Sequence, residues 1–135
     1  MPERKTLDRA RKAKREGKAP TTQASEFVRE EIEHIREGKH GVRSTKQAIA
    51  IGLSKARRSG VKLKPPKKGE ASARTREGAK RAYRAGQAGA AKAKSTTRSK
   101  SAAKALKREP RRVVSTQALS KQARAAAARR RRRSA

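Results

Sequence analysis

Apolar side chains larger than alanine are concentrated in one part of the chain, residues 27–63. The first helical repeat there has the i, i+4, i+7 spacing of a single face and consists of Val28, Ile32 and Ile35. Ser25 is suited to cap the amino terminus of this helix, and Gly38 is suited to end it. The pattern therefore predicts a helix with one apolar face that needs a partner.

A second helix is marked at both ends. Ser44 and Gln47 have the spacing of a capping box, and Gly60 provides a carboxyl-terminal stop before two prolines at 65–66. Small residues recur four apart on its apolar side: Ala48, Gly52 and Ala56. Because glycine inside a helix costs about 1 kcal/mol relative to alanine, we expect Gly52 to be compensated by close packing against the first helix. The first helix is acidic and the second is basic, which favours an antiparallel hairpin.

The rest of the chain lacks this agreement of start, periodicity and stop signals. From Ala71 onward it is dominated by Ala, Lys, Arg and Ser, a composition typical of disordered segments. We expect this tail to gain helix only when phosphates screen its charges, most clearly at residues 115–133, where Ser115 can act as N-cap.

The predicted fold class is therefore mostly α with extensive disorder, a small helical hairpin followed by a long basic low-complexity tail. The predicted organisation is a basic amino-terminal arm at residues 1–18, a helical hairpin module at 19–64 and an Ala/Lys/Arg/Ser-rich tail at 65–135. With apolar residues at 32% of the chain, there is material for one small core and no second one.

Charge identifies the class of partner. The net charge is +30 over 135 residues, and the parts 1–18, 19–70 and 71–135 carry +5, +6 and +19. Such a chain repels itself when compact unless an anion neutralises it. Nucleic acid is the expected polyanion, since each phosphate contacted releases a condensed counterion whatever the base sequence.

Several other classes are disfavoured. The chain has no Cys, no membrane-length apolar stretch and no secretory signal, so we expect a cytoplasmic protein that does not bind membranes. Two isolated aromatics, Phe27 and Tyr83, cannot build a base-stacking platform. His34 and His40 lack a catalytic or metal-binding setting, so we expect no enzymatic activity, no metal and no cofactor. The connection at 38–43 is long for a helix-turn-helix, which disfavours base-specific binding.

The candidate nucleic-acid-binding residues are cations at the start and end of the second helix, in the tail and in its terminal arginine run. They are Lys39, Arg43, Lys46, Lys55, Arg57, Arg58, Lys104, Lys107, Arg108, Arg111, Arg112, Arg129, Arg130, Arg131, Arg132 and Arg133. A helix amino terminus already favours an anion, and arginine adds planar bidentate contacts to phosphate.

The stretches SEFVREEIEHIREGKHG at 25–41 and RSTKQAIAIGLSKARR at 43–58 resemble a bacterial family of short basic proteins with a domain of unknown function. Members of that family are often labelled DNA-binding. The resemblance implies a bacterial source more than it implies a function. The Ala/Lys/Ser tail is similar in composition to the tails of linker-histone-like bacterial proteins, which implies DNA compaction.

Together these observations predict a nonspecific, histone-like DNA-binding protein of the bacterial nucleoid that coats or compacts duplex DNA. Two alternatives remain open. One is an RNA-associated or ribosome-associated basic protein. The other is an adaptor whose helical module self-associates or docks another protein while the tail adds affinity.

Overall fold

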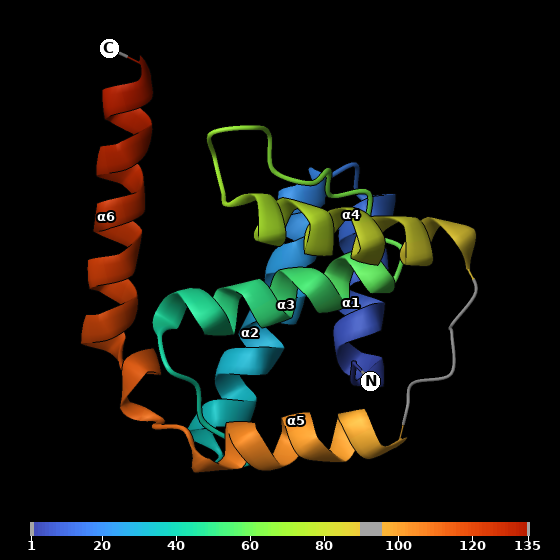
Figure 1. The fold of residues 1–135 in the computed structure, drawn as a ribbon. Helices are drawn as coiled ribbons and strands as arrows, with labels where there is room; N and C mark the ends of the chain where they lie inside the picture. Colours follow the sequence, from blue (N-terminus) through green and yellow to red (C-terminus); the bar gives the residue numbers. More distant parts are fainter. Residues whose placement is uncertain (1, 90–95, 135) are drawn as a thin grey trace.

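The computed structural model describes residues 2–89 and 96–134, and the described chain is built from helices (Figure 1). They are α1 (Arg4–Arg15), α2 (Pro20–Arg36), α3 (Thr45–Arg58), α4 (Ala73–Ala88), α5 (Thr96–Arg108) and α6 (Thr116–Ser134), with one 3-10 turn, η1 (Arg112–Val114), between the last two.

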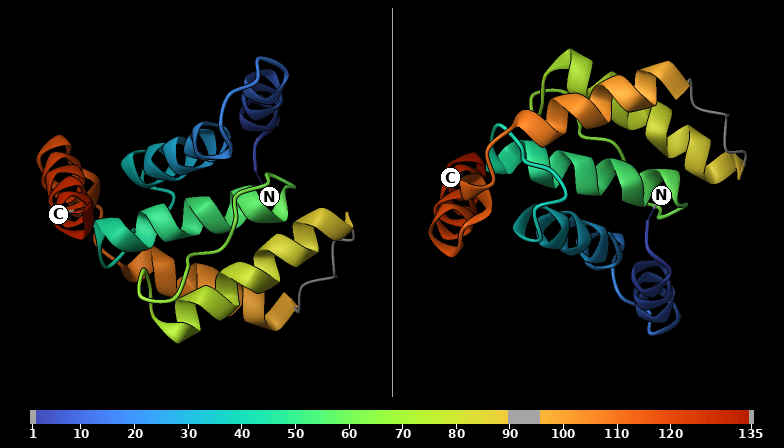
Figure 2. Two further views of the ribbon diagram at one scale, coloured as in Figure 1. Left: turned by 90° about the horizontal axis from the view of Figure 1, so that it is seen from above. Right: turned by 90° about the horizontal axis from the view of Figure 1, so that it is seen from below.

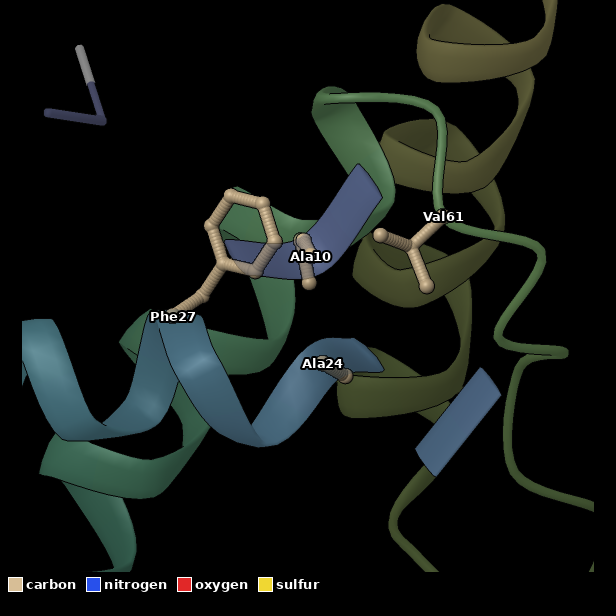
Figure 3. Packing of buried hydrophobic residues seen from close by; sticks show 5 residues of the cluster. Ala10, Ala24, Phe27 and Val61 are labelled. Atoms are coloured by element: carbon tan, nitrogen blue, oxygen red, sulfur yellow. The ribbon is translucent and has the colours of Figure 1, made fainter. Parts of the chain in front are cut away.

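Helix α3 is the centre of the arrangement. It lies between α2 on one side and α4 on the other, and α1 packs on the outer side of α2 (Figure 2). A first apolar cluster joins these elements and contains Ala10, Ala24, Phe27, Ala56 and Val61. Figure 3 shows the Phe27 ring of α2 directed toward Ala10 of α1, with Ala24 and Val61 nearby. Phe27 is the one large side chain of this cluster, and it is 1% exposed.

The backbones of α2 and α3 approach closely at Gly52. A Cβ atom on Gly52 would lie 2.6 Å from Cα of Val28, closer than real Cβ atoms come to other heavy atoms. Ala48 and Ala56, one turn to either side, are fully buried. The close packing predicted for this small-residue face is therefore confirmed. The two helices cross obliquely, whereas an antiparallel hairpin would align them along their lengths (Figure 1).

The predicted ends of α3 are also confirmed. The Ser44 hydroxyl accepts a hydrogen bond from the backbone N–H of Gln47 at 3.2 Å. The Gln47 side chain in turn accepts from the backbone N–H of Arg43 at 2.7 Å, one residue before the position that a standard capping box uses. Beyond the helix, Gly60 has a φ of +96°, which suits glycine at a helix stop.

The predicted start of α2 at Ser25 is wrong. The helix begins at Pro20, and the Ser25 hydroxyl donates to the carbonyl of Thr22 at 2.6 Å inside the helix. Proline at the first helical position has its φ preset and loses no hydrogen bond there, so it starts the helix earlier. The predicted end is confirmed, since Gly38 has a φ of +82° after the last helical turn.

The expectation of extensive disorder with a long basic tail is also wrong. Apart from residues 90–95, which lie outside the described residues, the segment from 73 to 134 is largely helical. Helix α4 packs on α3 through the buried Ala79 and Ala82. A Cβ on Gly86 would lie 1.7 Å from the carbonyl oxygen of Arg57, so this approach also needs a glycine. Composition did not reveal these contacts because alanine and glycine bury little area each.

The carboxyl-terminal part completes a second apolar cluster. Its buried members are Ile35, Val42, Ala48 and Val114, and Leu106 and Val113 pack against them. The backbone N–H of Gly41 donates to the carbonyl of Leu106, and that of Val42 donates to Pro110, both at 2.8 Å. A few apolar side chains and backbone hydrogen bonds thus attach the last forty residues to α2 and α3. Ser115 caps α6 as predicted, accepting from the N–H of Ala118 at 3.2 Å.

We predict that Gly52→Ala destabilises the fold by about 1–3 kcal/mol, because its methyl group would overlap the α2 backbone. The matched control is Gly78→Ala in α4, where an added Cβ meets nothing within 4 Å. That change should be neutral or stabilising by up to about 1 kcal/mol through helix propensity. Thermal and urea unfolding of the two variants measures the contrast. Equal stability of both would show that the two helices do not meet at Gly52.

Candidate nucleic-acid interface

The acidic side chains of this protein are paired within the fold. Of the eleven acids, ten lie within 4.0 Å of a Lys, Arg or His nitrogen. They are Glu3, Asp8, Glu16, Glu26, Glu30, Glu31, Glu33, Glu37, Glu77 and Glu109. Glu70 instead accepts a hydrogen bond from the backbone N–H of Lys67 at 2.8 Å. Little negative charge therefore remains to neutralise the other cations.

Two of these acids are fully buried at the junction of α1, α2 and α3. Glu31 is 1% exposed and lies 2.6 Å from both the Lys55 ammonium and Nε2 of His40. Glu30, also 1% exposed, accepts hydrogen bonds from the Thr6 hydroxyl at 3.2 Å and from the backbone N–H of Glu3. Burying these carboxylates is tolerable only because such partners replace water.

The structure places two predicted phosphate contacts, Lys55 and Arg57, in internal roles. Lys55 neutralises the buried glutamates, as described above. Arg57 is 7% exposed and donates to the carbonyls of Leu63 at 3.1 Å and Lys64 at 3.3 Å. Burial lowers the pKa of its guanidinium. The contacts of Arg57 fix the segment that follows α3. The next residue, Arg58, is exposed.

Six other predicted residues gather where the loop after α2 meets the end of α5 and η1. This basic corner consists of Lys39, Arg43, Lys107, Arg108, Arg111 and Arg112, all exposed. The Arg111 guanidinium lies over Gly38, at 2.6 Å from where a Cβ would stand. Acids at the corner are already occupied, since Arg43 pairs with Glu109 at 2.9 Å and Lys39 pairs with Glu37 at 3.4 Å.

Helix α5 extends the basic corner along one face. Its exposed cations occur at i, i+4, i+7 and i+8, which places them on one side of a helix: Lys100, Lys104, Lys107 and Arg108. We call this set the α5 stripe. Lys104, Lys107 and Arg108 are among the predicted nucleic-acid-binding residues and Lys100 is not, although its helical spacing from them is the signal that would have added it. That signal was missed because the segment was expected to be disordered.

The terminal arginine run lies away from the basic corner. Helix α6 has 19 residues, which is about 28 Å at the usual rise, and Arg129 to Arg133 occupy its far end. Arg133 donates to the carbonyl of Gly69 at 3.3 Å, beside the exposed Lys67 and Lys68. The predicted cations therefore form two separate basic regions. Lys46, in the first turn of α3, is exposed and belongs to neither.

An open apolar groove of about 570 Å³ lies over α2 and α3. Its apolar lining consists of Val28, Ile32, Ile49, Leu53 and Leu119. Leu119 comes from the start of α6, so the groove combines the predicted hairpin with the carboxyl-terminal part. Arg29 at its rim pairs with Glu33 at 3.1 Å.

One group of side chains has spacing that suits a metal ion. Glu3, Glu30 and His34 bring possible ligand atoms within 4.8 Å of one another. These atoms already serve the fold, since His34 lies 3.0 Å from the Glu3 carboxylate and Glu30 accepts from Thr6. We assign the group to the attachment of α1 on α2. The hydrogen bond with His34, followed by the contact with Lys5, lowers the pKa of Glu3 to about 2.

Residues 11–68 match a family of unknown function, DUF6496. No curated protein and no solved structure matches the chain. The predicted resemblance to a family of unknown function is confirmed to this extent. The matched residues cover the carboxyl-terminal end of α1, all of α2 and α3 and the stretch that follows, and they stop before α4. Among the described residues, no helix is sufficiently long and apolar to cross a membrane.

We predict that Lys55→Met destabilises the protein by about 3 kcal/mol or more, because it leaves a buried carboxylate without its cation. Arg58→Met, three residues further along α3 at an exposed position, should change stability by less than about 0.5 kcal/mol. Urea unfolding compares the two variants at equal loss of charge. A Lys55 variant as stable as the Arg58 variant would contradict the internal role of Lys55.

The pKa of Glu3 gives a prediction about acid stability. Because its folded pKa of about 2 lies below the ordinary glutamate value of 4.5, the ionised form stabilises the fold above pH 4.5. That stabilisation is lost as the pH falls from 4.5 toward 2. Glu3→Gln should therefore melt below the native protein at pH 6, and the difference should shrink across this window. A difference that does not vary with pH would contradict the assignment.

Proposed function

We propose that this protein binds duplex DNA without base specificity, neutralising phosphates and so coating or compacting the polymer. The observation that carries the proposal is the distribution of charge. Residues 96–134 contain fourteen Lys and Arg and a single acid, Glu109, which is already paired with Arg43. Counterion release makes such a surface bind polyanions whatever their sequence.

The aromatic residues favour DNA over single strands and RNA loops as the partner. Recognition of unpaired bases usually depends on exposed aromatic rings that stack on them. Phe27 is 1% exposed in the core, which leaves only Tyr83, partly exposed on α4. Contacts to the phosphate backbone are then the available mode of binding, and a nucleoid location and histone-like role follow from it.

A second candidate function is that of an adaptor that binds another protein. The apolar groove between α2, α3 and α6 favours it, since exposed apolar grooves are typical of protein-binding sites. In this alternative the cationic helices would only add affinity. An adaptor would show no preference between duplex DNA and RNA of equal charge.

The test is a competition experiment with the full-length protein and duplex DNA, single-stranded DNA and structured RNA of equal length, repeated over a salt series. We expect duplex DNA to bind most tightly, with an affinity loss of at least about a thousandfold between 50 and 200 mM salt, as for six or more phosphate contacts. Tighter binding of RNA, or an affinity that hardly responds to salt, would overturn the proposal.

A further inference from the structure

We propose that α5 is a dedicated duplex-binding helix, whose exposed cationic face binds the DNA backbone. This inference rests on the proposed function and goes further, because it assigns the contact to one element. It also gives that element a conformational response to the DNA.

Helix α5 stands apart from the other helices. Within the part of the chain that the structure describes, its backbone does not come close to that of another helix. Every residue from 96 to 105 is exposed, and the helix has no buried residue. Figure 1 shows α5 running along one end of the molecule, separate from α3 and α4. A helix with so little protein contact does not serve to build the core.

Helix α5 is attached to the rest of the protein at its carboxyl-terminal end. Leu106 packs against the second apolar cluster, and its carbonyl accepts the N–H of Gly41 at 2.8 Å. Two residues after the helix, Pro110 accepts the N–H of Val42 at the same distance. On a helical wheel Leu106 lies roughly opposite the α5 stripe, so this attachment directs the cations away from the body.

The charge per unit length of the α5 stripe is close to that of one DNA strand. From Lys100 to Arg108 the helix advances about 12 Å, and this length carries four cations. The mean interval is therefore about 4 Å, close to the roughly 3.4 Å of helix axis for each phosphate on a strand. The basic corner, with Arg111 and Lys39, continues the row beyond the end of α5.

The same features make α5 respond to binding. A helix of 13 residues that packs on the protein mainly at one end gains little stability from tertiary contacts, and a helix of this length is marginally stable in water by itself. Like charges four residues apart, Lys100 with Lys104 and Lys104 with Arg108, oppose it further. Phosphates placed along the stripe would screen these repulsions. DNA should therefore stabilise α5 selectively, more than helices such as α3 that are already packed.

The first test is a variant in which Lys100, Lys104, Lys107 and Arg108 are all replaced by Gln. The matched control replaces Arg11, Lys12, Lys14 and Arg15, four exposed cations of α1, by Gln. Loss of four phosphate contacts should reduce the slope of log affinity against log salt by about 3.6. When the salt is raised from 50 to 200 mM, the fold loss of affinity should be about a hundred times smaller for the α5 variant than for the native protein. The control should change the slope by less than about 1.

The second measurement is hydrogen exchange of the native protein with and without a duplex. We expect slowed exchange at the amides of residues 97–108 on binding, with little change in α3. This readout does not depend on the folding of any variant. If DNA leaves the exchange rates of these amides unchanged, the inference is overturned.

The outcomes separate this inference from the proposed function. If the native protein binds duplex DNA with a steep salt slope, and the α5 variant and the control have equal slopes, α5 is not the binding helix although the function stands. If the native protein has no preference for duplex DNA, the proposed function fails, and the assignment of α5 fails with it. A selective loss of slope in the α5 variant supports both.

Discussion

The fold depends on the contact between α2 and α3 at Gly52, where the two backbones approach too closely for any side chain. The chain has few bulky apolar residues, so it cannot fill a wide space between helices. Instead of large side chains filling the space between α2 and α3, the two backbones lie close together, and atoms of both helices gain dispersion contacts. The same solution recurs where Gly86 meets the Arg57 carbonyl and where Gly41 meets the Glu109 carbonyl. A protein poor in large side chains thus packs tightly by means of its smallest ones.

Close packing also determines how the charges are divided. The acids concentrate on α1 and α2, where they pair with α1, α3 and the loop after α2, and two of them are buried. Residues 96–134 instead contain fourteen Lys and Arg and one acid. The result is a neutralised interior beside a strongly positive exterior, which repels itself unless an anion binds. Fold and proposed function share this origin, because the acids that could have neutralised the exterior are used to hold the helices together.

The sequence by itself determined those features that depend on neighbouring residues. Ser44 and Gly60 marked the ends of α3, and Gly38 marked the end of α2, because caps and stops are made within one or two turns. The four-residue spacing around Gly52 identified the face that meets α2. The charge of +30 identified a polyanion as the expected partner, since that argument needs only composition. The resemblance to a family of unknown function was likewise visible in residues 25–58.

Only the tertiary structure decided which cations are internal and whether the tail is ordered. Lys55 and Arg57 have the same local sequence signal as the exposed Arg58, and burial next to distant partners distinguishes them. The order of residues 96–134 rests on contacts across more than sixty residues, such as Val114 in the cluster with Ile35. Helical propensity and like-charge repulsion nearly cancel in this segment, so local sequence does not decide its state. A few long-range apolar contacts supply the difference, and no short window of sequence contains them.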